Sequence, residues 1–249
     1  MLLIDEIPEF PKVNFGDNLS ELLVKTIRDK QFELNDNDVL CIASKVVSIA
    51  EKRAVCLNDI VPGETAIKIH ERIKRKDPRV LQLIIEATGD ETGGRLYIDG
   101  NFIAGWLPNG LCLTSAGIDK MDSNNVILLP ENPDKSAAII SEALYKNFGV
   151  KVGIVITDSD GRIDKSGSTQ IAIGVYGVPA LRKTFTPDNE TGKERKTVET
   201  LCDMIAAAAA LIMGQRGTNK PVVRIKGLKF DFDEEASIVA ALTQNKKGT

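Results

Sequence analysis

The sequence has few of the residues from which zinc sites and disulfide frameworks are built. It contains one histidine, His70, and four cysteines, none of which belongs to a Cys-x-x-Cys pair. Because a zinc site needs several such ligands at short spacing, the sequence argues against one. Three of the cysteines lie in apolar runs, which is typical of buried thiols in a reducing compartment. We expect His70 to be a solvent-facing residue of a charged helix.

Long apolar segments are also missing. The longest run, Met204–Met213, has ten residues and is mostly alanine, whereas a membrane-spanning helix needs about 20. The apolar residues at positions 2–4 are followed at once by Asp5 and Glu6, so the start lacks the apolar region of a signal peptide. We therefore expect a cytoplasmic protein that does not contact a membrane.

The chain has no excess of positive charge. Its net charge is -3, with 43% hydrophobic and 27% charged residues, values that are ordinary for a globular protein. Since nucleic-acid and membrane-surface binders need a basic face, we expect neither partner. The 249 residues suffice for one large domain or two modest lobes. We predict that residues 1–249 form a single unit, and the two-lobe alternative would place a cleft between the lobes.

The common nucleotide and hydrolase motifs are absent as well. Gly192-Lys193 is followed by Glu194, and Pro187 stands where a Walker loop needs its first glycine. No Gly-x-Gly-x-x-Gly follows a strand, and no Gly-x-Ser-x-Gly elbow is present. The sequence therefore predicts neither a P-loop, nor a Rossmann dinucleotide site, nor a serine nucleophile.

Helix and strand signals are present but do not alternate strictly. This mixture predicts an α+β protein with a mixed sheet rather than a regular doubly wound sheet. Turn and cap residues bound the expected elements. These are a helix from Asp17 over 19–27, a strand over 39–43, helices from Glu64 and from Asp77-Pro78, a hairpin over 96–104, strands ending at Asp119 and over 126–129, a helix over 137–148 that ends at Gly149, a strand over 150–156, a helix capped by Thr197 that ends at Gly214, and a strand over 222–225.

The most suggestive chemistry lies in Thr157-Asp158-Ser159-Asp160-Gly161, directly after an apolar strand. Carboxylate and hydroxyl oxygens at the end of a strand suit a hard cation such as Mg²⁺ or Mn²⁺. The same residues are also good turn formers, so an ordinary turn is the alternative interpretation. Asp119 is similar, because it is a single carboxylate after an apolar Ala-Gly-Ile segment.

A glycine-containing loop follows the last helix. Its backbone N–H groups and cations are suited to wrapping phosphates, whereas a plain helix-to-strand connection is the alternative, because Gly214 is expected after a helix. The loop comprises Met213, Gly214, Gln215, Arg216, Gly217, Thr218, Asn219 and Lys220.

Several segments in this order and spacing resemble the coenzyme F420-0:gamma-glutamyl ligase family over roughly residues 10–230. Any one of them is unremarkable, but together they cover most of the chain. The matching stretches are Phe10-Pro11-Lys12-Val13 before Gly16-Asp17, Val39–Arg53, Ser115-Ala116-Gly117-Ile118-Asp119, Gly153–Arg162, Ala172-Ile173-Gly174, Asp203–Gln215 and Pro221–Gly227.

The resemblance implies a GTP-dependent ligase that adds L-glutamate to the lactyl-phosphate carboxylate of a deazaflavin precursor, F420-0, a phosphodiester. It implies an F420 ligase-like α+β fold, an intertwined homodimer with the site in a cleft, and an acyl-phosphate intermediate. Two divalent ions, Mg²⁺ or Mn²⁺, would neutralise phosphate charge and hold the attacking and leaving oxygens in line.

Site residues follow from the resemblance by position. Asp119 and Asp158 would be catalytic metal ligands, and Ser159 and Gln215 would help to hold the second ion. The nucleotide would be lined by Phe10, Pro11, Lys12, Val13, Ser44, Lys45, Asp122 and the loop from Met213 to Lys220. Asp122, or its neighbour Asn124, stands where the family has an asparagine.

The chain departs from the family pattern at several positions. Ile49 replaces a lysine expected near the nucleotide, a role that Lys45 or Lys52 would take. Two further departures are Asn109, where histidine is common, and Met204, in place of the glutamate after Asp203. Lys165, in place of an arginine, keeps a charge but loses the bidentate fork. Two alternatives therefore stay open: a diverged ligase that joins an amino acid to another carboxylate, and a non-catalytic nucleotide- or metal-binding relative.

Overall fold

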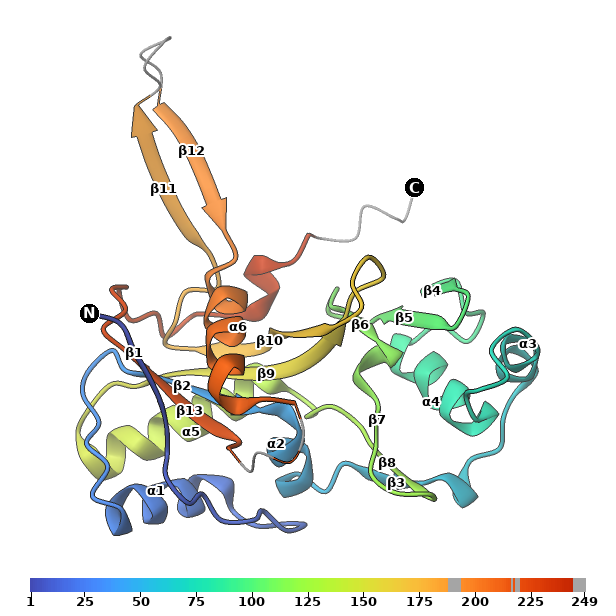
Figure 1. The fold of residues 1–249 in the computed structure, drawn as a ribbon, viewed down its shortest axis with the longest axis horizontal. Coiled ribbons are helices and arrows are strands. Elements are labelled where there is room, and N and C mark those ends of the chain that lie inside the picture. The colour runs from blue at the N-terminus through green and yellow to red at the C-terminus, as the bar shows by residue number, and fades with distance from the viewer. Residues whose placement is uncertain (188–193, 216, 218–219, 244–249) are drawn as a thin grey trace.

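The centre of the protein is a mixed five-stranded sheet, shown in Figure 1 in a computed structural model that describes residues 1–187, 194–215, 217 and 220–243. The pair β2–β9 is parallel and the other neighbours are antiparallel, so the predicted mixed sheet is confirmed. In sheet order the strands are β1 (Leu3–Glu6), β13 (Val222–Lys226), β2 (Val39–Ala43), β9 (Gly153–Gly161) and β10 (Ser168–Tyr176).

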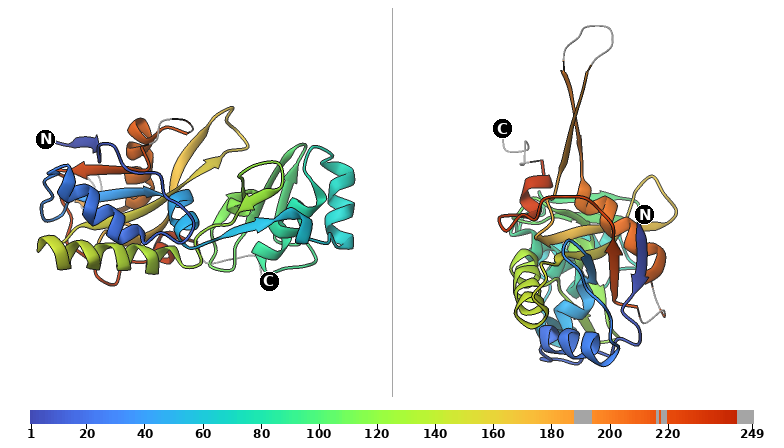
Figure 2. Two further views of the ribbon diagram at one scale, coloured as in Figure 1. Left: turned by 90° about the horizontal axis from the view of Figure 1, so that it is seen from below. Right: turned by 90° about the vertical axis from the view of Figure 1, so that its left-hand side faces the viewer.

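Helices cover both faces of this sheet (Figure 2). α6 (Leu201–Met213) packs on one face, whereas α1 (Leu19–Asp29) and α5 (Pro133–Phe148) lie on the other. The short helix α2 (Ser44–Ala50) follows β2 directly. Because the sheet is buried on both faces, its central strands are continuously apolar rather than alternating, as in β2, whose first four side chains are fully buried.

Residues 54–127, which we call the small lobe, contain a second hydrophobic core, although Leu111 and Leu113 of this segment pack in the first; the remaining described residues are the large lobe. In the small lobe, α4 (Pro78–Thr88) packs against β5 (Phe102–Trp106), α3 (Glu64–Arg72) packs against α4, and the strands form two small antiparallel sheets. One sheet contains β3 (Ala54–Cys56), β8 (Asn125–Ile127) and β7 (Asp119–Lys120), and the other contains β4 (Leu96–Asp99), β5 and β6 (Cys112–Thr114). Single 3₁₀ turns lie at η1 (Leu57–Asp59), η2 (Ser115–Gly117) and, in the large lobe, η3 (Ile238–Ala241).

A two-stranded hairpin projects from the large lobe, at the top of Figure 1. It consists of β11 (Arg182–Pro187) and β12 (Glu194–Glu199), and its strands are exposed along most of their length. An isolated hairpin of this kind is only marginally stable in water. Because most of its side chains are exposed, the hairpin has little packing against the other described residues of the chain.

Most element predictions are confirmed. β2 has the predicted bounds, and α3 begins at Glu64. Asp77 caps α4 with Pro78 at its first position, as expected. The hairpin over 96–104 forms as β4 and β5. Gly149 and Gly214 end their helices with φ of 72° and 65°, values that glycine adopts without strain.

Several boundaries differ from the prediction: α5 already begins at Pro133, β8 ends at Ile127, and β9 begins at Gly153. Four further differences have a clear structural reason. Thr157–Gly161 is not a turn but the second half of β9, because its backbone pairs with β10. Thr197 does not cap α6, since 194–199 pair with β11 and the helix starts after Thr200. Asn18, and not Asp17, caps α1 by accepting a hydrogen bond from the Glu21 N–H. The strand expected to end at Asp119 is interrupted by η2, where Ser115, Ala116 and Gly117 all have positive φ.

Candidate active cleft

Four segments of the large lobe meet at one edge of the central sheet. β1, β2 and β9 run in the same direction, because β1 and β2 are each antiparallel to β13 and β2 is parallel to β9. Ala43 pairs with Thr157, so Ser44 and Asp158 lie side by side just beyond that pair. β13 runs the opposite way and therefore begins at this edge. The carboxyl ends of strands in open α/β sheets are where ligand sites usually form.

A cleft of about 880 Å³ opens at this edge, and residues of the small lobe complete its wall. Every described residue that the sequence assigned to metal or nucleotide lines it, although their roles stay predictions. These are Phe10, Pro11, Lys12, Val13, Ser44, Lys45, Asp119, Asp122, Asp158, Ser159, Met213, Gly214, Gln215, Gly217 and Lys220. The assigned Arg216, Thr218 and Asn219 lie outside the described residues.

Asp158 is the most perturbed acid of the cleft. Its Oδ1 accepts a 2.6 Å hydrogen bond from the buried Ser44 hydroxyl. Burial raises the pKa of Asp158 to about 7, and the charges of Asp119 and Asp160 raise it as well, whereas the Ser44 bond lowers it. An ionised carboxylate held beside two others is costly unless a cation accompanies it. The position of Asp158 is thus suited to a positively charged ligand.

Asp119 reaches the cleft from the small lobe. It follows η2, whose consecutive left-handed residues are rare outside glycine. Ser115 in that turn accepts a 2.7 Å hydrogen bond from the Lys76 ammonium group, which fixes the turn to the segment before α4. Across the cleft, the Lys45 Nζ lies 4.0 Å from Asp119 Oδ2. Asp119 is mostly exposed, so it remains accessible to a ligand.

The donor set fits a hard divalent cation. Successive side chains of a strand point to opposite faces, so Asp158 and Ser159 present oxygen atoms on two sides of β9. Among the described residues, no three His, Cys, Asp or Glu side chains form a cluster that holds a metal by itself. Mg²⁺ is nevertheless usually bound by one or two carboxylates, with water and substrate phosphates completing the shell. Asp119, Asp158, Ser159 and the amide oxygen of Gln215 match that pattern.

Asp160 has a different task from Asp158. Its Oδ1 accepts a 2.8 Å hydrogen bond from the Thr114 N–H of β6, and the Thr114 hydroxyl donates to the Gly161 carbonyl oxygen at 3.0 Å. The end of β9 is therefore tied to the small lobe. Asp160 and Gly161 thus join the lobes and do not line the cleft, whereas Ser159 does.

Lysine side chains give the cleft its positive charge. Lys12, Lys45, Lys120 and Lys220 all line it, and the Lys220 Nζ lies 2.6 Å from Glu6 Oε2 at the end of β1. Phosphate groups of a nucleotide are bound by such ammonium groups together with backbone N–H groups of glycine-containing loops.

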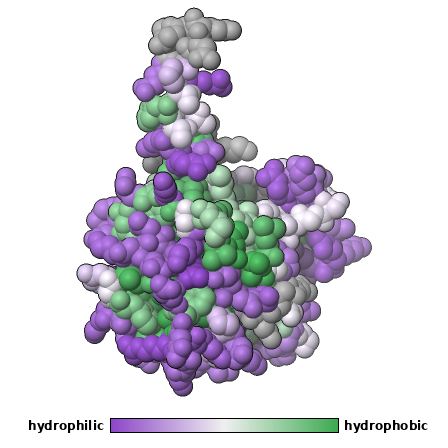
Figure 3. Space-filling model, turned by 60° about the vertical axis from the view of Figure 1, so that its left-hand side comes forward, coloured by the Kyte–Doolittle hydropathy of each residue, from purple (hydrophilic) through white to green (hydrophobic). Residues whose placement is uncertain are grey.

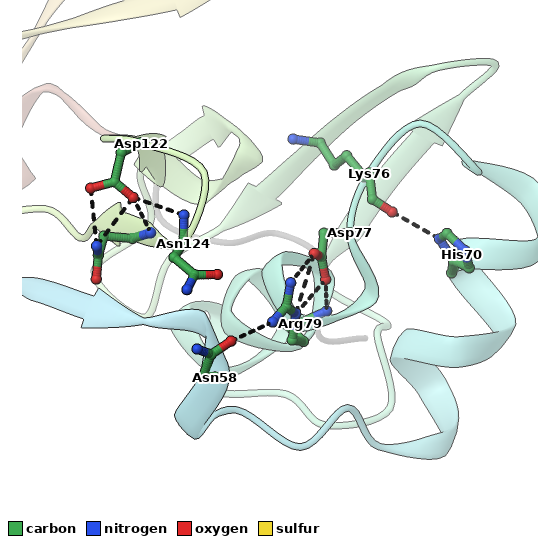
Figure 4. Close-up of polar contacts among 8 residues, drawn as sticks. Asn58, His70, Lys76, Asp77, Arg79, Asp122 and Asn124 are labelled. Carbon is green, nitrogen blue, oxygen red and sulfur yellow. Dashed lines mark hydrogen bonds and ion pairs between the residues drawn. The ribbon is translucent and has the colours of Figure 1, made fainter.

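Two further predicted residues have their polar atoms engaged within the small lobe, as Figure 4 shows. Asp122 Oδ1 accepts hydrogen bonds from the N–H groups of Asn124 and Asn125 at 2.7 and 2.8 Å, and these bonds lower its pKa, with the Asn125 side chain having the largest effect. His70 Nδ1 lies 2.8 Å from the Lys76 carbonyl oxygen, so its ring is partly buried and not fully solvent-facing as expected. It does not line the cleft.

The departures from the family pattern fall in different places. Ile49 lines the cleft, and Lys45 is the lysine that lies there with it. Lys52 instead packs beside Gly16, where an added Cβ would meet its Cε at 2.4 Å. Met204 is exposed on α6, outside the cleft. The Asn109 side chain caps the Leu111 N–H in a turn of the small lobe and does not reach the cleft either. Lys165 pairs with Asp164 in the exposed β9–β10 connection.

The sequence analysis did not single out Lys120, Met121, Gln170 or Thr157 as individual site residues, although all four line the cleft. Lys120 and Met121 follow Asp119 directly, so their position beside a predicted metal ligand could have marked them as site residues. Gln170 has no such signal, because it comes from a different strand and meets the cleft through the β9–β10 pairing.

Comparison with known proteins identifies similar chains. A family model described as F420-0:Gamma-glutamyl ligase matches residues 8–227. A protein of Methanopyrus kandleri named coenzyme F420:L-glutamate ligase is 37% identical over 235 residues, covering 93% of this chain and 89% of the relative. Proteins with the same name from Methanosarcina mazei and Methanocaldococcus jannaschii are 34% and 33% identical, over 93% and 90% of this chain and 88% and 87% of theirs. None of the described helices is long and apolar enough to span a membrane.

Proposed function

The chain belongs to the F420-0:Gamma-glutamyl ligase family, and from this premise we propose that it adds L-glutamate to the deazaflavin precursor F420-0, using GTP and divalent metal ions. The proposal rests on the convergence of several kinds of polar and charged group in one cleft. Three carboxylates, a glycine-containing loop and four lysines come from both lobes and line the same space. A nucleotide, a cation and an anionic acceptor need this combination of groups.

The proposed reaction has two steps. A carboxylate oxygen of the acceptor attacks the γ-phosphorus of GTP, the bond to the β–γ bridging oxygen breaks, and GDP leaves. The amine nitrogen of glutamate then attacks the carbonyl carbon of the acyl phosphate, the carbon–oxygen bond to phosphate breaks, and the amine proton is released as the amide forms. The acceptor carboxylate is already ionised, so the first step needs no general base.

Each part of the cleft has a role in this scheme. Lys12, Lys45 and Lys220 bind the phosphate oxygens as point charges, and the N–H groups of the loop after α6 orient them. Asp119 and Asp158 hold the metal, Mg²⁺ or Mn²⁺, and two ions fit the family resemblance. When bound, the cation neutralises phosphate charge and aligns the attacking and leaving oxygens. Lys45 takes over the contact of the missing lysine at Ile49.

Two alternative functions can be weighed against this proposal. A diverged ligase with the same chemistry on another carboxylate is favoured by Ile49, which changes the wall of the cleft itself. A non-catalytic relative would need the departures to remove turnover, but Met204 lies on the surface of α6 and not in the cleft. We therefore place the ligase first and the diverged ligase second.

Phosphate release from GTP with Mn²⁺ tests the proposal. Release that requires both L-glutamate and F420-0 supports it, and mass spectrometry should find the glutamylated product. Release that requires a different acceptor supports the diverged ligase, and replacing GTP by ATP tests the nucleotide. Binding of GTP without turnover for any acceptor would refute a catalytic function.

We also propose that two copies of the chain form a homodimer through the hairpin and α6. Strand alternation places Phe185 and Val198 on one face of the hairpin, and both are about half exposed. Met204 and Leu211 expose apolar side chains on α6, and Leu211 is 82% exposed. Figure 3 shows apolar surface at the base of the projecting hairpin. An exposed apolar patch continuous with an unpartnered hairpin is typical of an interface between subunits.

A further inference from the structure

Gln170 is a buried polar residue of the cleft for which the reaction scheme gives no task. Its side chain is 5% exposed, although it lines the cleft with the metal and phosphate residues. It lies on β10 directly opposite Ser159 of β9. Opposite residues of an antiparallel pair point to the same face of the sheet, so Gln170 lies on the side of Ser159 and Thr157 and not on that of Asp158.

The amide of Gln170 contacts both segments that contain predicted metal ligands. Its Oε1 accepts a 2.9 Å hydrogen bond from the Thr157 hydroxyl, next to Asp158 in β9. Its Nε2 donates to the Gly214 carbonyl oxygen at 3.4 Å and lies 3.3 Å from the Met213 sulfur. The Gly214 carbonyl belongs to the peptide group that joins Gly214 to Gln215. The bond from Gln170 therefore sets the plane of the peptide from which the Gln215 side chain starts.

We propose that Gln170 is a positioning residue that holds β9 and the loop after α6 in the one arrangement that binds the metal. This inference rests on the metal site of the proposed function. Gln170 does not touch the metal; it acts through Thr157 on the strand segment of Asp158 and through Gly214 on Gln215. Outer groups that orient metal ligands in this way typically change metal affinity or activity by about 10- to 100-fold when they are removed.

The chemistry of the side chain supports this assignment. Only an amide offers an acceptor and two donors on one rigid plane, so it can link a hydroxyl donor to a carbonyl acceptor. A leucine of similar size fills the space but leaves the Thr157 hydroxyl and the Gly214 carbonyl without this link. The weak 3.7 Å contact from the Thr157 hydroxyl to the Met213 sulfur would then be the remaining side-chain hydrogen bond from Thr157 to the end of α6 among the described residues, so the two segments would be held less firmly.

The test measures Mn²⁺ binding to the full-length, metal-free protein by calorimetry, without nucleotide. Gln170→Leu should bind Mn²⁺ about tenfold more weakly than wild type. The matched control is Gln82→Leu, because Gln82 also links two groups through its amide, Gly63 N–H and Glu86 Oε1, but in the small lobe. It should bind Mn²⁺ as wild type does. A merely structural Gln170 would lower the melting temperature and leave Mn²⁺ affinity within twofold, which would overturn the inference.

If Gln170→Leu fails to fold, Thr157→Val provides a second test. It removes the hydroxyl that donates to Gln170 at 2.9 Å and that lies 3.7 Å from the Met213 sulfur, so it should also weaken Mn²⁺ binding. The loss of Mn²⁺ affinity in the double variant should be clearly smaller than the sum of the two single losses, because both changes remove the shared Thr157–Gln170 bond. Fully additive losses would overturn the inference. If the wild-type protein binds no Mn²⁺, both the proposed metal site and the role of Gln170 are refuted. If wild type binds Mn²⁺ and Gln170→Leu binds it equally well, only the role of Gln170 is refuted.

Discussion

Replacing Asp158 with asparagine should stabilise the metal-free protein and remove its metal binding at the same time. Burial, followed by the charges of Asp119 and Asp160, raises the pKa of Asp158 from its ordinary value of 3.8 to about 7. This rise corresponds to about 4 kcal/mol between the two protonation states. Because water in the cleft screens part of that energy, we expect a gain of about 1–3 kcal/mol. Asparagine keeps an Oδ1 that accepts the Ser44 hydrogen bond.

The stability gained by Asp158→Asn should increase with pH. A folded-state pKa above the unfolded value means that the neutral form of Asp158 favours folding. This contribution is complete below about pH 4 and is lost as the pH rises through about 7. The difference in unfolding free energy between the variant and wild type should therefore grow from pH 5 to pH 8. Urea unfolding with a chelator present measures it.

Adding metal should make wild type more stable than Asp158→Asn, the reverse of the order without metal. Mn²⁺ at 100 times its dissociation constant stabilises wild type by about 2.7 kcal/mol and should add nothing to Asp158→Asn. The control is Asp122→Asn, since hydrogen bonds lower the pKa of Asp122 and its replacement should not stabilise the protein at any pH. An Asp158→Asn protein that is less stable than wild type at pH 8 without metal would refute the charge argument. Retained metal-dependent activity would refute the ligand assignment.

Three further predictions concern the frame and the interface. Arg224→Leu should lower the free energy of unfolding by about 3 kcal/mol in urea, since it leaves the buried Asp38 without its cation, 3.6 Å away. Adding Asp38→Asn should recover part of the loss; no recovery would contradict the charge explanation. Gly174→Ala should cost about 3 kcal/mol by thermal unfolding, because the new Cβ would lie 2.5 Å from a backbone carbon at the start of α5. Gly167→Ala, which meets nothing within 4 Å, is its control, and equal effects would refute the packing argument. Leu211→Lys should reduce the mass in sedimentation from a dimer to a monomer; an unchanged dimer would place the interface elsewhere.

The sequence located most elements correctly because their signals are local. Asp77-Pro78 starts a helix and Gly149 ends one, whatever packs against them. Two of the errors occur where pairing with the neighbouring strand of a hairpin overrides local preference. The composition of Thr157–Gly161 is typical of a turn, but β10 supplies backbone partners that keep it extended. Thr197 is a good cap, but pairing with β11 holds it in a strand.

The candidate site divides in the same way. Its acids, its glycine-containing loop and its family resemblance were readable from neighbouring residues, and the match over residues 8–227 confirms the resemblance. The separate tasks of Asp158 and Asp160 were not readable, because the distinction depends on Thr114 of the small lobe. Gln170 gave no signal at all, since an isolated glutamine in a strand has no local preference that marks a site.

The sequence by itself determined the approximate places of most predicted helices and strands, which groups carry charge, and which family pattern they follow, since each of these depends on residues a few positions apart. Only the tertiary structure decided which of those groups meet. The parallel register of β2 and β9 places Ser44 beside Asp158, and the contact between the lobes brings Asp119 to the same cleft. Strand order and lobe packing arise from contacts between distant parts of the chain, and no short stretch of residues contains that information.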